Sequence, residues 1–424
     1  MIELTPVTTL NAVVHVPGSK SLTQRALIAA ALAEGESTLV GPLASEDTAY
    51  TMTALRRMGV SVDDSDPECW KVRGTGGMLV APGEDIFLGN NGTATRFLTS
   101  VASLAHGRIR ISGGKRMAER PIGPLMEALR GWDVRIKSEA GNDCPPLIID
   151  ADGLAGGRTV LPEGKSSQYL SSLLLVAPFT REPAELEVQG EVYSRPYVEM
   201  TLDVMADFGI RVEAAPSLTY FRIPRGGYTG IEYRVEGDAS GASYFWAAAA
   251  ITGGRVTVAN VPVPSLQGDA DLVPILARMG CEVSRVKGGI TVQGPSRLEA
   301  VEVDMSNMPD VAPTLAVVAA FAEGTTVISN VAHLRIKECD RLAAMVTELG
   351  KMGAEIEEEP DRMIIHGRSG GVNLHGAEIE TYDDHRIAMC FGVAGLRVPG
   401  VRITNEGCVK KSFPDFWQRF QGMC

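Results

Sequence analysis

Residues 18–40 read GSKSLTQRALIAAALAEGESTLV, and this stretch decides the fold. Its Ala-rich segment Ser21–Ala33 predicts a helix, and the β-forming run Ser37–Val40 predicts a strand after Gly35. The same order of apolar segment, turn residue and β-forming run recurs along the chain. The residues that precede the six strands are Gly35, Gly107, Pro183, Gly254, Gly324 and Gly400. The sequence therefore predicts six copies of one unit.

A second helix followed by a glycine recurs in the same way, beginning with Asp47–Met58 before Gly59. Consecutive glycines of this series are 71 to 78 residues apart. The later members are Gly131, Gly209, Gly280 and Gly353. Repeats of this length are unlike those of solenoids, so we expect small α/β subdomains. The alternative is an α/β chain that merely alternates helix, glycine and strand without a repeat. Two independent series of positions, the turn residues before the strands and the glycines after the second helices, recur at similar spacing and argue against it.

Six units divide naturally into two domains of three units, within an α/β (α+β) fold. The predicted domains are 21–237, which is inserted, and 1–20 with 238–424, which is discontinuous. The segment Ile2–Val16 is expected to be the first strand and to complete the discontinuous domain. The chain then crosses between the domains near Lys20 and near Gly237, and two crossings favour domain closure about a hinge.

The composition narrows the class of protein. The chain has 424 residues and a net charge of −12, which argues against nucleic acid as a partner because phosphate backbones need a basic surface. Its seven cysteines are scattered without a Cys-x-x-Cys pair, so we expect reduced thiols and no metal site. We find no signal-peptide pattern at Met1–Leu4 and no apolar run of membrane-spanning length. The expected protein is a cytoplasmic monomer without a cofactor.

An equivalent helix start is predicted 14 residues before each turn residue. The six positions are Ser21, Thr93, Tyr169, Ser240, Asp310 and Arg386. The first turn of a helix has free N–H groups and a partial positive charge, so it attracts anions. Six such starts brought together predict an anion-binding centre.

Three of these starts carry polar groups suited to phosphate. Lys20, Ser21 and Arg25 supply two cations and a hydroxyl within a turn and a half, although they do not form a complete P-loop. Ser166–Gln168 adds two hydroxyls and an amide at another start. In Asn90–Thr93 a glycine allows backbone N–H groups to approach a ligand closely. Ordinary helix capping is the alternative interpretation at each start.

Two charge-rich motifs, Arg335–Arg341 and Asp383–Arg386, occupy the later repeats. A solvated surface is the alternative for the first of them. In the second, His385 and Arg386 open an apolar helix, which is electrostatically unfavourable unless an anion lies there. These residue types predict chemistry by general acids and bases with cationic stabilisation of charge.

Eight short motifs occur in order: Pro17–Ser21, Leu88–Ala94, Ala118–Gly123, Ser166–Gln168, Arg195–Tyr197, Lys337–Leu342, Asp384–Arg386 and Lys411–Pro414. Together they resemble the 5-enolpyruvylshikimate-3-phosphate synthase family over essentially the whole chain. The resemblance implies two inside-out α/β barrel domains, each of three βαβαββ units. It also implies a reaction of the shikimate pathway of aromatic amino acid biosynthesis. In that reaction the enolpyruvyl group of phosphoenolpyruvate passes to the 5-hydroxyl of shikimate 3-phosphate through a tetrahedral intermediate, and phosphate is released.

The same resemblance assigns site residues. The candidates for phosphoenolpyruvate are Lys20, Asn90, Gly92, Arg120, Gln168, Arg341, Arg386 and Lys411. The candidates for shikimate 3-phosphate are Lys20, Ser21, Arg25, Ser166, Ser167, Gln168, Ser194, Tyr197, Asp310, His333 and Lys337. Asp310 is implied as the base on the 5-hydroxyl and Glu338 as the acid for the methylene carbon, while Lys20 and His385 compete for these proton transfers.

The chain departs from the family pattern at Asn91, where Ala is usual, at Phe97, where Pro is usual, and at His333, where Asn is frequent. The nearest alternative activity is that of UDP-N-acetylglucosamine 1-carboxyvinyltransferase. That family usually carries a reactive cysteine on the loop that corresponds to Gly113–Glu119, which has none here. An RNA 3′-phosphate cyclase and a non-enzymatic repeat scaffold are more remote alternatives. The acidic charge disfavours the first, and charged residues at matching helix starts disfavour the second.

Overall fold

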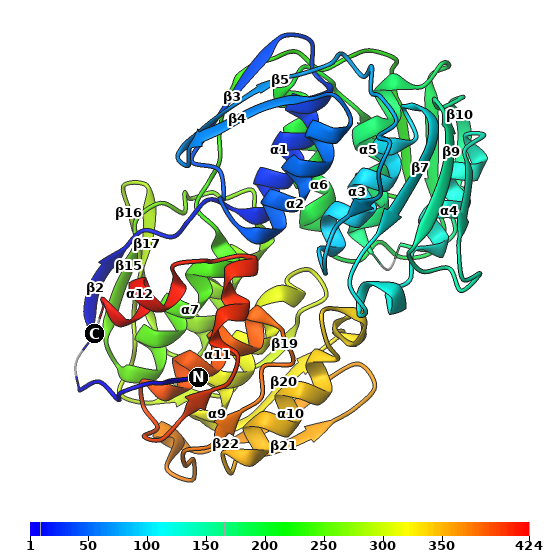
Figure 1. Ribbon diagram of the computed structural model, residues 1–424. Helices are drawn as coiled ribbons and strands as arrows, with labels where there is room; N and C mark the ends of the chain where they lie inside the picture. Colours follow the sequence, from blue (N-terminus) through cyan, green and yellow to red (C-terminus); the bar gives the residue numbers. More distant parts are fainter. Residues whose placement is uncertain (9, 165, 424) are drawn as a thin grey trace. The chain divides into compact units, whose positions relative to one another are not determined.

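Two compact units make up the chain in the computed structural model, which describes residues 1–8, 10–164 and 166–423. One unit comprises Met1–Ser19 with Glu236–Cys424, and the other comprises Lys20–Val235. We call them the discontinuous unit and the central unit. Helices and strands alternate along both (Figure 1), so the predicted mixture of α and β structure is confirmed.

Within the described ranges, three sheets form in each unit, and in all six a parallel pairing of strands is followed by antiparallel pairing. Four of the sheets have four strands, one has five and one has three. The sheets of the central unit have these orders: β14 (Glu232–Arg234), β3 (Glu36–Val40), β5 (Cys69–Arg73), β4 (Ser61–Asp66); β6 (Ile86–Phe87), β7 (His106–Ser112), β9 (Leu147–Asp152), β8 (Arg135–Ser138); and β10 (Gly157–Leu161), β11 (Ala184–Val188), β13 (Tyr220–Ile223), β12 (Glu213–Ala214). In each of them the first pair of strands is parallel and the others are antiparallel.

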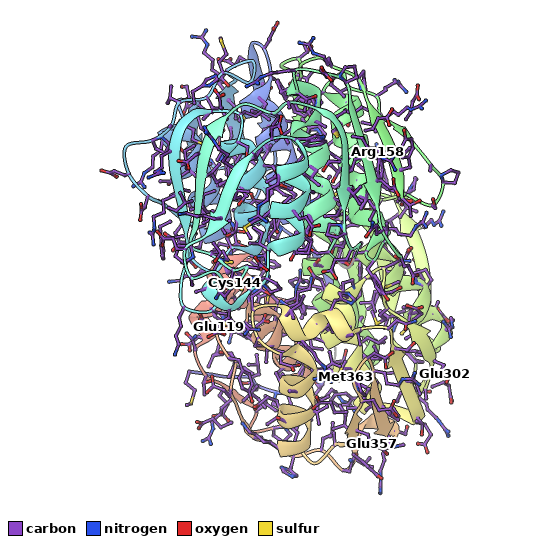
Figure 2. All side chains as sticks on the ribbon, turned by 90° about the vertical axis from the view of Figure 1, so that its right-hand side faces the viewer. Glu119, Cys144, Arg158, Glu302, Glu357 and Met363 are labelled. Carbon is purple, nitrogen blue, oxygen red and sulfur yellow. The ribbon has the colours of Figure 1, made fainter. Side chains whose placement is uncertain are left out.

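The discontinuous unit repeats this pattern. Its sheets have these orders: β2 (Asn11–Val14), β15 (Arg255–Val258), β17 (Gly289–Gln293), β16 (Glu282–Val286); β18 (Leu298–Glu299), β20 (Ala322–Ser329), β22 (Met363–Gly367), β21 (Glu355–Glu358), with β19 (Glu302–Asp304) also on β20; and β23 (Glu378–Ile379), β24 (Arg402–Ile403), β1 (Ile2–Glu3). In the fifth sheet Glu302 and Glu357 have exposed side chains, while Met363 on β22 is buried (Figure 2). Along β22 itself Met363 and Ile365 are buried while Ile364 between them is partly exposed, which is the alternation of a sheet with one face on the core.

The prediction of a single first strand over Ile2–Val16 is wrong. Two short strands replace it: β1 pairs with β24 and β2 pairs with β15, so they belong to different sheets. Pro6 lies between them and has no backbone N–H to donate to a sheet. The central unit is completed in a comparable way, because its last strand β14 pairs with its first strand β3.

Buried helices form the centre of each unit. In the central unit α1 (Lys20–Leu32), α3 (Gly92–Ala102) and α5 (Ser167–Val176) pack against one another. In the discontinuous unit α7 (Ala239–Thr252), α9 (Ala312–Ala320) and α11 (His385–Gly395) do the same (Figure 1). These helices are buried along most of their length, as α7 is from Ala239 to Ile251. A helix without a solvent face needs no amphipathic pattern.

The second helix of each repeat is α2 (Glu46–Arg57), α4 (Gly123–Gly131), α6 (Arg195–Asp207), α8 (Leu272–Arg278), α10 (Arg341–Lys351) or α12 (Phe416–Gln421). After four of these helices comes a glycine with a left-handed backbone conformation, such as Gly59 at φ 96° after α2. Gly131 is an exception to the prediction, since it lies inside α4, and Asp133 takes the left-handed conformation at φ 63°. Aspartate tolerates this region better than most residues. Across the described part of the chain, no helix has both the length and the apolar character needed to span a membrane.

Candidate active site

The predicted helix starts are confirmed by the observed helices. In the described residues, α1, α3, α5, α7 and α11 begin at Lys20, Gly92, Ser167, Ala239 and His385. Asp310 lies in a short 3-10 helix, η4 (Pro309–Val311), which leads directly into α9. Each unit therefore presents the starts of three mutually packed helices. Some candidate residues lie at these starts, such as Lys20, Gly92 and Arg386, and others lie on neighbouring elements, such as Tyr197 on α6 and Arg341 on α10.

Lys20 opens α1 and forms an ion pair with Asp47, with 3.2 Å between Nζ and Oδ2. The backbone carbonyl of Asp47 accepts hydrogen bonds from Gln24 Nε2 and from Asn91 Nδ2, at 3.3 and 2.7 Å. The Asn91 Oδ1 in turn accepts from the backbone N–H of Ala94 and caps α3. Capping is thus part of the role of Asn91, whose amide also ties α3 to α2. An alanine side chain could neither donate to the Asp47 carbonyl nor accept from the Ala94 N–H.

Arg25 is a buried cation behind the start of α1, with 2% of its surface exposed. Its Nε donates to Thr201 Oγ1 at 2.7 Å, and its terminal nitrogens donate to the backbone carbonyls of Ser21 and Tyr197 at 2.9 and 3.0 Å. The guanidinium also lies 5.3 Å from the centre of the Phe97 ring. Burial lowers the pKa of Arg25 to about 10, and the nearby tyrosines oppose the shift. Arg25 remains charged at neutral pH and fixes the backbone around Ser21 and Tyr197.

Arg120 packs directly over Gly92. A Cβ atom at Gly92 would lie 2.5 Å from the Arg120 Nη2 atom, closer than van der Waals contact allows. Arg120 Nη1 lies 3.4 Å from both the carbonyl and the side-chain oxygen of Asn90. Behind them Arg96 donates to the carbonyls of Gly92 and Pro121, at 3.2 and 2.9 Å, and so holds the two segments together. A side chain at position 92 would require the Arg120 guanidinium to move, because the guanidinium occupies the adjacent space.

The hydroxyl-rich start of α5 lies beside the start of α3. Gln168 Nε2 donates to Thr93 Oγ1 at 3.2 Å, which brings these two helix starts together. Ser166 is the N-cap residue of α5, yet among the described residues its side chain makes no capping hydrogen bond. Ser194 precedes α6 in a left-handed conformation at φ 53° and is followed by the helix that carries Tyr197. A capping role therefore does not account for Ser166.

In the discontinuous unit, Arg341 is the centre of a carboxylate cluster and is 1% exposed. Its Nε donates to Asp384 Oδ2 at 2.7 Å, its Nη1 to Asp310 Oδ1 at 3.1 Å, and its Nη2 to Glu338 Oε2 at 2.9 Å. Burial alone would lower the pKa of Arg341, but Asp384, Glu338 and Asp310 raise it above its ordinary value. Arg341 is thus a permanently charged cation that orients the three acidic groups around it.

Asp310 lies between several cations of the described chain. Arg386 Nη2 is 2.6 Å from Asp310 Oδ2, while Arg341 Nη1 and Lys337 Nζ are 3.1 and 3.8 Å from Oδ1. These nitrogens come from α11, α10 and the end of η5 (Ala332–Ile336). The start of α9 therefore meets two charge-rich motifs, and the solvated surface proposed as the alternative for Arg335–Arg341 is wrong for Arg341. Arg335 does lie nearer the surface, bound to Asp340 and Glu358.

Asp384 and His385 begin α11, and both are buried. Asp384 Oδ1 accepts from the backbone N–H of Arg386 at 2.9 Å, which caps the helix, and lies 3.6 Å from His385 Nδ1.

Burial and the charge of Lys337 lower the pKa of His333 to about 4, so His333 is neutral at pH 7. Lys411 closes η7 (Glu406–Lys411) and is also buried. A neutral His333 keeps a hydrogen-bond acceptor that a protonated ring lacks.

Sequence reasoning missed several buried carboxylates that organise the cations. Asp47 pairs with Lys20, and Asp269 accepts a hydrogen bond from Ser240. Asp384 belongs to the motif Asp383–Arg386, but its pairing with Arg341 was not predicted. A buried cation needs a counter-ion, and that requirement alone could have directed attention to acids near the helix starts. Pairing across repeats could not be read from the chain, however. In the described part of the protein, we find no group of three metal-ligating side chains.

Buried guanidinium groups, with lysines near the starts of packed helices, are typical of an α/β protein that binds anionic small molecules. The particular family is shown by comparison with known proteins. The sequence model of the family of EPSP synthase (3-phosphoshikimate 1-carboxyvinyltransferase) matches residues 4–420. The chain belongs to this family, which makes it a transferase rather than a scaffold.

Similar proteins agree over the full length. The 3-phosphoshikimate 1-carboxyvinyltransferase of Shewanella amazonensis is 43% identical over 426 residues, covering 100% of this chain and 98% of that protein. The chloroplastic enzyme of Arabidopsis thaliana is 43% identical over 437 residues, with coverage of 98% and 83%. The structure of EPSP synthase from Acinetobacter baumannii superposes with a TM-score of 0.84 at 29% identity, over 99% of this chain and 97% of that one. These relatives do not favour the UDP-N-acetylglucosamine alternative.

Proposed function

We propose that this protein transfers the enolpyruvyl group of phosphoenolpyruvate to the 5-hydroxyl of shikimate 3-phosphate and releases phosphate. The observation that supports it most directly is the cluster of Arg341, Arg386 and Lys337 around Asp310 in a chain of this family. Both substrates carry phosphate and carboxylate groups, which guanidinium groups bind through paired hydrogen bonds. The shikimate pathway would be the place of this reaction.

The proposed ligands of each substrate are the residues that the family pattern assigns. For phosphoenolpyruvate they are Lys20, Asn90, Gly92, Arg120 and Gln168 of the central unit and Arg341, Arg386 and Lys411 of the discontinuous unit. For shikimate 3-phosphate they are Lys20, Ser21, Arg25, Ser166, Ser167, Gln168, Ser194 and Tyr197 of the central unit and Asp310, His333 and Lys337 of the discontinuous unit. Arg25 contributes mainly by fixing Ser21 and Tyr197, since its observed hydrogen bonds go to the protein.

The proposed chemistry needs one base and one acid. Asp310 takes the proton of the attacking 5-hydroxyl, and Glu338 delivers a proton to the methylene carbon of phosphoenolpyruvate. Protonation leaves C2 cationic, and the hydroxyl oxygen bonds to C2 to give the tetrahedral intermediate. The C–O bond to phosphate then breaks, and the new methyl group loses a proton, which restores the carbon–carbon double bond. Arg341 contacts both carboxylates and so holds them in fixed positions relative to each other. Lys20 and His385 are the other candidates for proton transfer.

We further propose that the two units are the two inside-out α/β barrel domains of the family, each with three βαβαββ repeats. The central helices with sheets around them in each unit support this arrangement. The proposed state is a monomer in the cytoplasm.

A phosphate-release assay tests the proposed function. The purified protein should release phosphate from phosphoenolpyruvate when shikimate 3-phosphate is added and should not do so with UDP-N-acetylglucosamine. The reason is the cysteine-free loop Gly113–Glu119 together with the hydroxyls at Ser166 and Ser167. Turnover with the sugar nucleotide alone would contradict the proposal.

A methyl group at Gly92 should disturb the phosphoenolpyruvate site through Arg120. Gly92→Ala is expected to raise the Michaelis constant for phosphoenolpyruvate, because the guanidinium at 2.5 Å must move away. Inhibition by glyphosate, the inhibitor of this family, should weaken more than the Michaelis constant for phosphoenolpyruvate rises, because the longer skeleton of glyphosate needs more of the same space. Steady-state kinetics with and without glyphosate measure both changes.

Gly114→Ala is the matched control. A Cβ atom there meets only the Gly89 carbonyl at 3.8 Å, an ordinary contact. The Michaelis constant for phosphoenolpyruvate and the inhibition constant for glyphosate should therefore stay close to their wild-type values. Equal losses of affinity for glyphosate and phosphoenolpyruvate in Gly92→Ala would show that this position does not discriminate between them.

A further inference from the structure

A further carboxylate, Asp269, lies near Arg386, one of the cations around Asp310 in the discontinuous unit. It belongs to η3 (Gly268–Asp271), which packs against both α7 and η4, and only 2% of its surface is exposed. The Ser240 hydroxyl in the first turn of α7 donates a short hydrogen bond to Asp269 Oδ2. Asp269 is therefore a buried acid that is tied to the start of a central helix.

Ser240 connects this acid to Arg386. The Nη2 atom of Arg386 lies 3.4 Å from Ser240 Oγ and 2.6 Å from Asp310 Oδ2. Because the Ser240 proton is directed to Asp269, a lone pair of the same oxygen is available to the guanidinium. One nitrogen of Arg386 thus lies between two acceptors, the carboxylate of Asp310 and the hydroxyl of Ser240.

The electrostatics of Asp269 point to a role beyond packing. Burial and the negative charges of Asp310 and Asp238 together raise the pKa of its carboxyl group to about 6, while the positive charge of Arg386 and the hydrogen bond from Ser240 oppose the shift. A buried carboxylate is costly unless it interacts with a cation or with strong donors. An asparagine would fill the same space without that cost, so the charge itself needs an explanation.

We propose that Ser240 and Asp269 are positioning residues that fix the guanidinium of Arg386 for the anionic groups of phosphoenolpyruvate. This inference rests on the proposed function. When Asp310 accepts a proton it loses its charge, and its hold on Arg386 weakens. Ser240, polarised by Asp269, supplies a second acceptor that keeps the Arg386 Nη2 atom in place throughout.

Two single variants test the proposal. Ser240→Ala and Asp269→Asn should each raise the Michaelis constant for phosphoenolpyruvate about 10-fold, because a hydrogen bond to a charged group is weakened or lost. The turnover number and the Michaelis constant for shikimate 3-phosphate should change less than about 3-fold. Equal changes for both substrates, or an unchanged constant for phosphoenolpyruvate, would overturn the proposal.

Matched controls separate positioning from folding. Ser243→Ala removes another buried hydroxyl of α7, one whose hydrogen bonds go to the Ser240 carbonyl and to Thr314. Asp271→Asn removes an exposed carboxylate of the same short helix as Asp269. In both control variants the Michaelis constant for phosphoenolpyruvate should equal that of the wild type. A rise in Ser243→Ala as large as that in Ser240→Ala would assign the effect to helix packing instead.

A double-mutant cycle shows whether Asp269 acts through Arg386. Asp269→Asn should raise the phosphoenolpyruvate constant in the wild type but add little in an Arg386→Lys background. The same rise in both backgrounds would show that Asp269 does not act through Arg386. The wild-type assay distinguishes the two failures: an inactive wild type contradicts the proposed function, whereas an active wild type with unchanged variants contradicts only the role of Asp269.

Discussion

Asp310→Asn should reduce turnover by about 100-fold or more while leaving substrate binding measurable. The amide fills the space of the carboxylate but cannot accept the proton of the 5-hydroxyl. It also carries no charge to attract Arg341, Arg386 and Lys337, which lie 2.6 to 3.8 Å from the carboxylate oxygens. Single-turnover kinetics under saturating substrates would measure the chemical step, and calorimetry would measure the binding of shikimate 3-phosphate.

The control for this variant is Asp304→Asn. Asp304 is an exposed carboxylate of β19, bound to the Ser306 N–H and the Asn330 side chain, and it has no role in the proposed chemistry. Its replacement should leave turnover near the wild-type value. If Asp310→Asn also turned over at a near-normal rate, Asp310 could not be the base.

The largest effect on stability is expected for Arg341→Met. Loss of the guanidinium leaves the carboxylates of Asp384 and Glu338 buried without their main cation, and removal of one partner of a buried ion pair typically costs about 3–5 kcal/mol. Urea unfolding followed by circular dichroism would measure the loss. Hydrogen exchange should localise it to the discontinuous unit.

Arg335→Met is a matched control from the same motif. Arg335 pairs with Asp340 and Glu358, but its side chain is 27% exposed, so water can replace the lost contacts. Exposed pairs contribute about 0–1 kcal/mol, and the free energy of unfolding should fall by no more than that. A loss in Arg341→Met as small as that in Arg335→Met would mean that the buried carboxylates take up protons or water at little cost.

The repeat was predictable because it depends on local patterns. Apolar helices of the α1 type, glycines such as Gly59 and β-forming runs appear in the sequence at nearly constant spacing. Partner choice between distant strands was not predictable, since β1 and β2 are separated only by a short segment yet pair with β24 and β15. Gly131 shows a second limit: the glycine is in the expected place, but the chain turns at Asp133.

The cations of the candidate site were predictable, and their counter-ions were not. Lys20, Arg341 and Arg386 stand at helix starts where isolated positive charge is unfavourable, so their residue types alone indicated an anion. Asp47 and Asp269 lie in other segments, and their sequence surroundings resemble those of ordinary helix starts. Only the three-dimensional structure shows that Asp47 lies 3.2 Å from Lys20 and that Asp269 reaches Arg386 through Ser240.

The pairing of the first strands constrains the order in which a nascent chain can fold on the ribosome. The central unit is complete once β14 has emerged, because all its strands lie between Lys20 and Val235. The amino-terminal strands must wait much longer: β2 needs β15, and β1 needs β24 near the carboxyl terminus. During synthesis β2 therefore remains unpaired until β15 has emerged, and β1 until β24 has emerged, while the central unit between them can already fold. Both strands are exposed to chaperones and proteases in that interval.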